Sequence, residues 1–419
     1  MLQPNKNGVL AVFLLLLCSP MVAQRIATME IKLPAGGNGL SIPVEVNLDA
    51  ITFLPDSVLQ LVEVTQNKRV QLPYQISTSS HRVLHWLIAP GKAGGRLFEL
   101  VKGAPMLAPA VVQLQDAAGS ITVTSRNNNL LRYNYATVYP PPGVDTVYKR
   151  SGFIHPLWSP RGQELTRTNA PDHYHHWGLW NPWTQVLFEK DTIDFWNLYK
   201  KQGTVRFAHL LSAVSGGVFA EYASLHEHVV FKKMGESKTA LNEVQTVRVY
   251  QPEPNAAYYI ADITIVLTAA GKSAVELLEY RYGGLGLRAT AEWNKSNSVV
   301  LTSEGKARKE ADGSTARWCM IQGSVKGDSA GLVMMSYPAN YNHPEPLRVW
   351  PEDMNGRGDV FLNFSPTKNR NWTISPGKEY LLRYRFLVFN DRFTGKQADA
   401  AWQNFANPPV ILIKKEPQK

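Results

Sequence analysis

Histidine and tryptophan are concentrated in residues 148–183, which hold four of the ten histidines and four of the eleven tryptophans. At the centre of this stretch, Asp172 begins the run Asp-His-Tyr-His-His, which ends at His176. Imidazoles titrate near neutral pH and are the most common metal ligands. The run therefore indicates a site for metal binding or for general acid/base catalysis.

Side chains alternate along an extended strand, so His173 and His175 should point to one side and Asp172 and His176 to the other. Two imidazoles at i and i+2 could share a divalent metal such as zinc, calcium or manganese, with one more ligand from elsewhere. The predicted metal ligands are Asp172, His173, His175 and His343. The same histidines could instead act without a metal, or could merely be satisfied by hydrogen bonds within a Pro-rich loop.

Other polar residues extend the candidate site. Arg150 precedes His155 in KRSGFIHP, and the forked donors of an arginine suit a carboxylate or a polarised sugar oxygen, although a surface salt bridge is an equal alternative. A strand followed by glycines places Glu279, Tyr282 and Arg288 near a neighbouring cleft. The predicted catalytic residues are His155, His175, His176, Arg150, Glu279 and Tyr282.

Aromatic residues in and beyond the stretch could form flat walls on which sugar rings stack, or could fill the core between sheets. A second polar, aromatic loop follows a buried strand near residue 337, where functional groups often lie. The predicted substrate-binding residues are Trp158, Trp177, Trp180, Arg288, Asn340 and Tyr341.

Composition restricts the class of protein. The chain has 419 residues, 44% of them hydrophobic, and a formal net charge of +10, but its basic residues are scattered and do not indicate a nucleic-acid partner. Residues 1–23 read as a cleaved signal peptide, and no later stretch has the length of a membrane span. Only Cys319 follows the signal, so we expect a periplasmic or secreted protein without disulfides.

Short β-type runs separated by turns fill most of the chain and predict an all-β protein. We expect a small β-barrel or sandwich over 24–103, a large antiparallel β-sandwich over 104–407 and a charged tail over 408–419. Tyr258 to Thr268 alternates apolar and polar residues as a half-buried strand should. Only Lys396 to Phe405 has the pattern of a helix.

Several segments resemble an exported bacterial family labelled PmoA-like, or methane oxygenase. They are RSGFIHPLWSPRGQELT, PDHYHHWGLW, the run from ARWCMIQG to YNHPEPLRVW, and SPGKEYLLRYRFLVFND. The first unit, with IPVEV and VLHWLIAPGKAGGRLFEL, resembles the small β-barrel of rhamnogalacturonan-lyase-like proteins. The motif positions that match are Arg150, His155, Asp172, His173, His175, His176, Trp318, Asn340 and His343.

The resemblance implies exported polysaccharide or glycoside breakdown on a supersandwich akin to that of mutarotases. Methane oxidation by an integral membrane subunit is not expected, because no membrane span follows the signal. Our first hypothesis is a lyase or hydrolase acting on a carbohydrate, which could be acidic. The alternatives are a non-catalytic carbohydrate-binding protein and a mutarotase-like epimerase.

Overall fold

The computed structural model describes residues 24–33, 39–66, 68–91, 94–106, 110–232, 235–254 and 257–417. The predicted signal peptide lies outside these residues. The described part of the chain consists mostly of antiparallel strands, so the predicted all-β class is confirmed. No helix in this part is long and apolar enough to cross a membrane.

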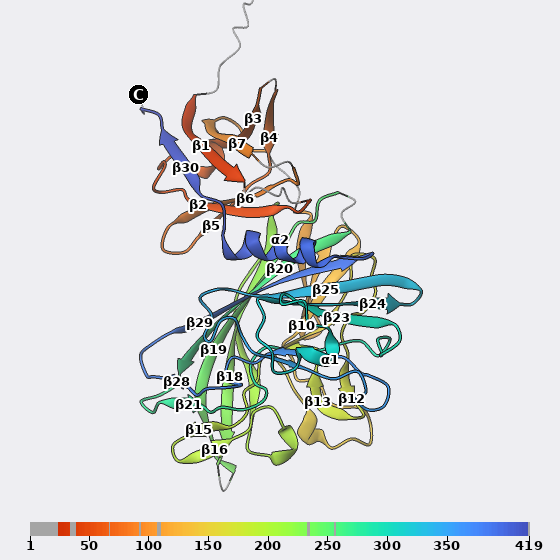
Figure 1. Ribbon diagram of the computed structural model, residues 1–419. Coiled ribbons are helices and arrows are strands. Elements are labelled where there is room, and N and C mark those ends of the chain that lie inside the picture. The colour runs from red at the N-terminus through yellow and green to blue at the C-terminus, as the bar shows by residue number, and fades with distance from the viewer. Residues whose placement is uncertain are drawn as a thin grey trace, which may run out of the picture.

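The N-terminal unit contains a five-stranded and a three-stranded sheet (Figure 1). In spatial order, the first consists of β30 (Ile411–Lys415), β1 (Arg25–Leu33), β7 (Gly94–Lys102), β3 (Leu59–Thr65) and β4 (Lys68–Leu72). The second consists of β2 (Ile42–Asn47), β6 (Arg82–Ile88) and β5 (Gln75–Thr78), and η1 (Asp56–Val58) precedes β3. Apolar side chains from both sheets form one core, with Trp86 and Phe98 completely buried.

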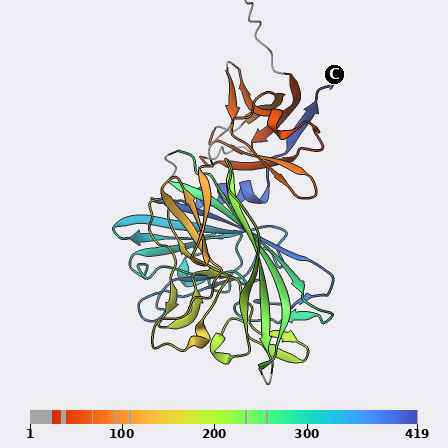
Figure 2. The ribbon, with the colours of Figure 1, turned by 180° about the vertical axis from the view of Figure 1, so that it is seen from behind.

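Two eight-stranded sheets form the large sandwich below this unit (Figures 1 and 2). The first is β26 (Leu347–Val349), β27 (Phe361–Phe364), β22 (Gly286–Arg288), β14 (Leu179–Trp180), β11 (Phe153–Leu157), β10 (Asn128–Asn134), β9 (Ser120–Ser125) and β8 (Val112–Ala117). The second is β17 (Gly203–Val214), β18 (Phe219–Phe231), β19 (Ser237–Tyr250), β20 (Tyr258–Ala269), β29 (Tyr380–Asn390), β25 (Asp328–Ser336), β24 (Trp318–Val325) and β23 (Ser298–Thr302).

Smaller elements complete the sandwich. They are the sheet of β16 (Asp191–Ile193), β15 (Val186–Phe188), β21 (Val275–Leu277) and β28 (Trp372–Ile374), the pair β12 (Thr168–Ala170) and β13 (His173–Trp177), and the short helices η2 (Thr146–Tyr148), η3 (Leu198–Lys200) and α1 (Arg308–Ala311). The β12–β13 pair lies at the end of the sandwich away from the N-terminal unit (Figures 1 and 2).

The alternation seen in the sequence produces the core of the sandwich. In β20, the five apolar residues at every second position from Tyr259 to Leu267 are at most 3% exposed, whereas Asp262 and Thr264 face outward. Inward side chains of both large sheets belong to one continuous apolar cluster. The predicted strand is therefore confirmed, and burial of its apolar face stabilises the sandwich.

The predicted helix is confirmed as α2 (Gly395–Ala406). The Thr394 side chain accepts a hydrogen bond from Gln397 N, and the Gln397 side chain accepts one from Thr394 N, which is a capping box. Trp402 and Phe405 pack the helix onto the outer face of the second large sheet. The segment after α2 corrects the prediction of a charged tail, because Ile411–Lys415 pair with β1 as β30.

Gly178, directly after β13, has φ +63°, and a Cβ at this position would meet the Ile154 carbonyl oxygen and lie 2.9 Å from His155 Cβ. We expect Gly178→Ala to lower the free energy of unfolding by ~2–4 kcal/mol, because alanine is strained in this left-handed backbone conformation and its Cβ would clash with neighbouring atoms. Denaturant unfolding of Gly162→Ala is the matched control, because Gly162 has φ +86° but nothing within 4 Å of a Cβ. Equal losses for the two variants would contradict the predicted clash.

Candidate functional site

A cavity of about 580 Å³ opens beside β13. It is lined by Tyr148, Pro171, Asp172, His173, Tyr174, His175, His176, Trp196, Asn197, Tyr199, Lys200, Tyr280, Arg281, Tyr282, Arg348, Trp350, Met354 and Phe361. These residues come from η2, from β13 and the residues before it, from η3 and the residues before it, from the segment between β21 and β22, and from β26, β27 and the loop that joins them. Segments far apart in the sequence therefore meet at this end of the sandwich.

Three histidine rings line the cavity together. The ring centroids of His173 and His176 are 4.8 Å apart, those of His175 and His176 are 4.9 Å apart, and those of His173 and His175 are 5.4 Å apart. The predicted placement of His176 on the opposite side from His173 and His175 is therefore wrong. The register between β12 and β13 shifts between Thr168 and Ala170, and such an irregularity breaks the two-residue period of a strand.

His173 forms a hydrogen-bonded pair with Asp172. The distance from His173 Nδ1 to Asp172 Oδ2 is 2.8 Å, and Asn355 Nδ2 donates to the same oxygen at 2.9 Å. Burial alone would raise the pKa of Asp172, but the hydrogen bond from His173 and the charge of Arg288 lower it below its usual range. The ionised carboxylate thus orients His173 and leaves Nε2 as the ring nitrogen free to exchange a proton.

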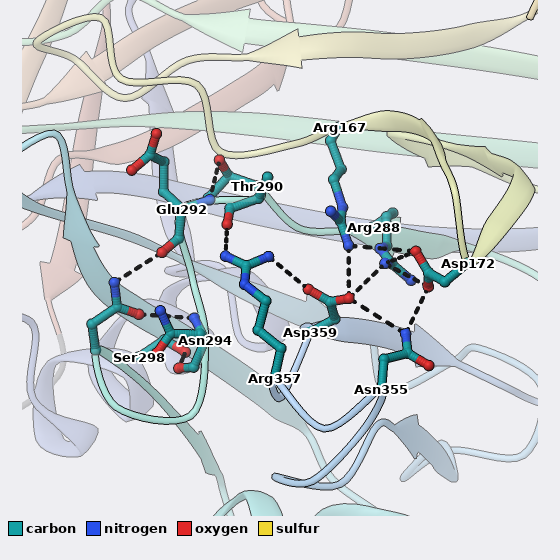
Figure 3. Close-up of polar contacts among 12 residues, drawn as sticks. Arg167, Asp172, Arg288, Thr290, Glu292, Asn294, Ser298, Asn355, Arg357 and Asp359 are labelled. Carbon is teal, nitrogen blue, oxygen red and sulfur yellow. Dashed lines mark hydrogen bonds and ion pairs between the residues drawn. The ribbon is translucent and has the colours of Figure 1, made fainter. Parts of the chain in front are cut away.

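A buried arginine, Arg288, contacts the carboxylate of Asp172 (Figure 3). Arg288 Nη2 lies 2.8 Å from both oxygens of Asp172 and 3.4 Å from Asp359 Oδ2. Arg167 joins the same network through Asp359 at 3.1 Å. Arg288 is completely buried and its guanidinium lies 4.4 Å from the centre of the Trp350 ring. Arg288, predicted to bind substrate, therefore contacts Asp172 and does not line the cavity.

The other two histidines are held neutral. Burial, followed by the charge of His173, lowers the pKa of His175 to about 3, and burial lowers the pKa of His176 well below its usual value. At neutral pH both rings can accept or donate a hydrogen bond, but they are poor carriers of a positive charge. His173, which is more exposed and paired with a carboxylate, is the better placed base.

The lowered pKa of His175 makes stability depend on pH. In the unfolded chain this ring takes up a proton below about pH 6.5, whereas in the folded protein it stays neutral to about pH 3, so the unfolding free energy falls as pH decreases. Replacing His175 by Gln should reduce this slope between pH 6 and 4 by up to about 1.4 kcal/mol per pH unit.

The measurement is urea unfolding of both proteins across this pH range. Groups that titrate in both proteins contribute equally to the two slopes, so their contributions cancel in the comparison. Glu345, which has its pKa raised to about 7 by burial, is one such group. Identical slopes would show that folding does not lower the pKa of His175.

A second polar wall faces the histidines. Asn197 Nδ2 donates to Tyr282 Oη at 2.9 Å and to Asp194 Oδ2 at 2.7 Å, and Lys200 Nζ lies 2.8 Å from the same Asp194 oxygen. Burial raises the pKa of Tyr282 to about 12, so its hydroxyl is protonated at neutral pH. The Arg281 guanidinium lies beside the rings of Tyr280 and Tyr282 and has no carboxylate within salt-bridge distance in the described part of the chain.

The two tryptophans that line the cavity were not among the residues predicted from the sequence. Trp196 and Trp350 line the cavity, and Trp350 lies 4.7 Å from His173 between ring centroids. Trp177 and Trp180, predicted to bind substrate, are buried in the aromatic cluster with Trp196. Trp158 is buried beneath Arg132 and does not line the cavity. Trp196 and Trp350 each stand beside polar loop residues, but so do other tryptophans, and this feature alone would not have found them.

Several predicted site residues lie elsewhere. His155 Nδ1 lies 3.0 Å from Thr166 Oγ1, and burial lowers its pKa to about 4. Glu279 is exposed and is not part of the cavity wall. Asn340 bonds to Glu345, and Tyr341 stacks on Trp372. These residues are therefore not brought together with His173.

Arg150 is also separated from the cavity. It is 2% exposed, and burial lowers its pKa to about 9, while the charge of Glu243 opposes this change. Glu243 itself contacts His226, His228 and Asn181 inside the sandwich. Arg150 thus belongs to a polar network in the core and does not line the cavity wall.

The predicted metal ligands are not assembled. His343 stacks on Trp402 of α2, whereas Asp172 and His173 bond to each other and Asp172 also to Arg288. Within the residues that the structure describes, no group of three or more His, Cys, Asp or Glu side chains has a geometry that could hold a metal ion.

The fold and cavity define an all-β sandwich protein with a small N-terminal β unit and a histidine-rich polar cavity. The chain belongs to a family of unknown function, DUF6807, whose model matches residues 120–403. No curated protein matches the chain.

Two solved structures are similar to the chain. One is an alpha-mannosidase from Enterococcus faecalis V583, with 7% identity, a TM-score of 0.45, and coverage of 94% of this chain and 47% of that one. The other is a protein in glycosyl hydrolase family 38 from Enterococcus faecalis, with 7% identity, a TM-score of 0.44, and coverage of 94% and 48%. The chain spans about half the length of each.

Proposed function

We propose that the protein is an exported carbohydrate lyase that cleaves an acidic glycan by β-elimination at the histidine-rich cavity. The observation that carries the proposal is the Asp172–His173 pair, which faces a cavity with aromatic walls and cationic residues. Aromatic rings stack on the faces of sugars, and the guanidinium of Arg281 suits a carboxylate. The resemblance of the N-terminal unit to the β-barrel of rhamnogalacturonan-lyase-like proteins supports a uronate substrate.

In the proposed step, His173 Nε2 removes the proton from the carbon next to the sugar carboxylate. The electrons of that C–H bond form a carbon–carbon double bond, and the bond from the adjacent carbon to the glycosidic oxygen breaks. Tyr282 supplies a proton to the departing oxygen, because Asn197 donates to its oxygen and leaves the phenolic proton free. Arg281 neutralises the negative charge that grows on the sugar carboxylate.

The small number of carboxylates in the cavity favours elimination over hydrolysis. A typical glycosidase needs two carboxyl groups that flank the scissile bond. Among the described lining residues, Asp172 is the only carboxylate, and it is engaged by His173, Arg288 and Asn355. Glu279, the predicted second carboxylate, does not line the cavity.

The test is incubation of the purified protein with uronate-containing and neutral glycans. We expect new ultraviolet absorbance from an unsaturated product with uronate glycans only. New reducing ends without this absorbance would instead indicate a hydrolase, interconversion of sugars without cleavage an epimerase, and binding without turnover a carbohydrate-binding protein. Cell fractionation tests export, and recovery of the protein from the cytoplasm would contradict it.

A further inference from the structure

A second cavity, of about 810 Å³, lies between the N-terminal unit and the outer face of the second large sheet. One wall is formed by Val44 to Asn47 of β2 together with His85 of β6. The opposite wall consists of outward side chains of β18, β19, β20 and β29, and Phe405 of α2 closes one side. Figures 1 and 2 show this junction at the end of the sandwich opposite β13, so the two cavities are separate.

A row of alternating charges crosses the sheet at the floor of this cavity. The β-sheet register pairs Glu221 with Arg248, Arg248 with Asp262, and Asp262 with Arg385. Arg248 Nε lies 2.6 Å from Glu221, and Arg385 contacts both oxygens of Asp262 at 2.7 Å. These charges satisfy one another and form a rigid, preorganised polar surface.

The neighbouring row of the sheet leaves polar groups available. The register pairs Thr246 with Thr264 and Thr264 with Arg383, and all three side chains line the cavity. In the described part of the chain, no hydrogen bond of either threonine hydroxyl and no ion pair of the exposed Arg383 is found. The Arg383 guanidinium lies 5.3 Å from the centre of the Tyr337 ring. Two hydroxyls and one guanidinium therefore face the cavity together, and the charge of Arg383 also acts on the Glu45 carboxylate in the same cavity.

Arg383 and Tyr337 also line a third cavity, of about 650 Å³, on the same side of the sandwich. Its wall contains Tyr341, which stacks on Trp372 at 4.5 Å with the ring planes only 3° apart, and Tyr380. Because Arg383 and Tyr337 line both cavities, the two adjoin there and are together called the groove. Hydroxyls, a guanidinium and stacked aromatic rings along the groove match an elongated acidic sugar chain.

We infer that this groove is a second, non-catalytic binding site for a uronate-containing oligosaccharide. The carboxylate of one sugar binds Arg383, the threonine hydroxyls bind sugar hydroxyls, and another sugar stacks near Tyr341. The choice of a uronate rests on the proposed function, but the site does not need the histidine cavity. Its role is to hold a long glycan on the enzyme.

The experiment is calorimetric titration of the full chain carrying His173→Ala, so that ligand is not turned over. The probes are hexagalacturonate and the same hexamer with its carboxylates reduced to alcohols. We expect adding Arg383→Ala to weaken binding of hexagalacturonate by about 10- to 100-fold, which corresponds to loss of one charged hydrogen bond. Adding Arg392→Ala is the matched control, because Arg392 is exposed and lines neither of the two cavities that form the groove.

Binding that is as tight in the Arg383→Ala protein as in the control, equal binding of both hexamers, or no binding of hexagalacturonate would overturn the inference. The lyase proposal is tested separately, by measuring turnover of a uronate disaccharide by protein that retains His173, with and without Arg383→Ala. If Arg383→Ala leaves that turnover unchanged but weakens binding of hexagalacturonate, both proposals stand. If no glycan is turned over while the hexamer still needs Arg383, the lyase proposal fails and the groove remains.

Discussion

Replacing His173 by alanine should lower kcat by about 100- to 10,000-fold on any glycan that the protein cleaves, since a positioned base contributes about that factor. His173 is the cavity histidine held by an ionised carboxylate, at 2.8 Å from Asp172 Oδ2. The measurement is steady-state kinetics followed by the absorbance of the unsaturated product. KM should change far less than kcat, because the base acts mainly in the transition state.

The matched control is His343→Ala, which removes a histidine that stacks on Trp402 outside the cavity. It should keep kcat within about threefold of the parent, since it leaves the base in place. Circular dichroism of both variants checks that they fold. A folded His173→Ala protein with the parent's kcat would show that another group removes the proton.

Replacing Arg288 by methionine should lower the free energy of unfolding by ~3–5 kcal/mol, because Asp172 loses its contact with a buried cation and Asp359 keeps only its more exposed partners, Arg167 and Arg357. Arg288 is completely buried and contacts Asp172 and Asp359 at 2.8 and 3.4 Å. Methionine has a similar volume, so the loss reports the charge and not a large cavity. Denaturant unfolding at neutral pH measures it.

Arg357→Met is the matched control, because Arg357 also bonds to Asp359, at 3.0 Å, but its side chain is 43% exposed. An exposed ion pair contributes at most ~1 kcal/mol. If both variants lose the same free energy of unfolding, the burial of Arg288 does not explain its contribution to stability. We also expect the Arg288 variant to lose activity while folded, because Asp172 then orients His173 less firmly.

Local patterns were enough for the fold class and for much of the strand content. The alternation in Tyr258 to Thr268 determines a half-buried strand because side chains on a strand change face at each residue. The same reasoning located α2 and identified 173–176 as unusual in composition. Each of these features is set by neighbours within a few residues.

Two features depart from the simple local rules. The irregular pairing of β12 with β13 brings His176 to the same cavity as His173, against the two-residue period. β30 joins the N-terminal sheet because the free edge of β1 accepts it, and nothing near Ile411 in the sequence indicates that partner.

The sequence by itself determined an all-β chain and pointed to the stretch from Asp172 to His176, where we propose the catalytic base. Only the tertiary structure decided what surrounds it: Arg288 as a buried support, Trp196 and Trp350 as walls, and His155 and His343 outside the cavity. Arg288 lies 116 residues from Asp172 in the chain, and Trp350 is farther away still. Packing between such distant segments leaves no periodic pattern in the sequence.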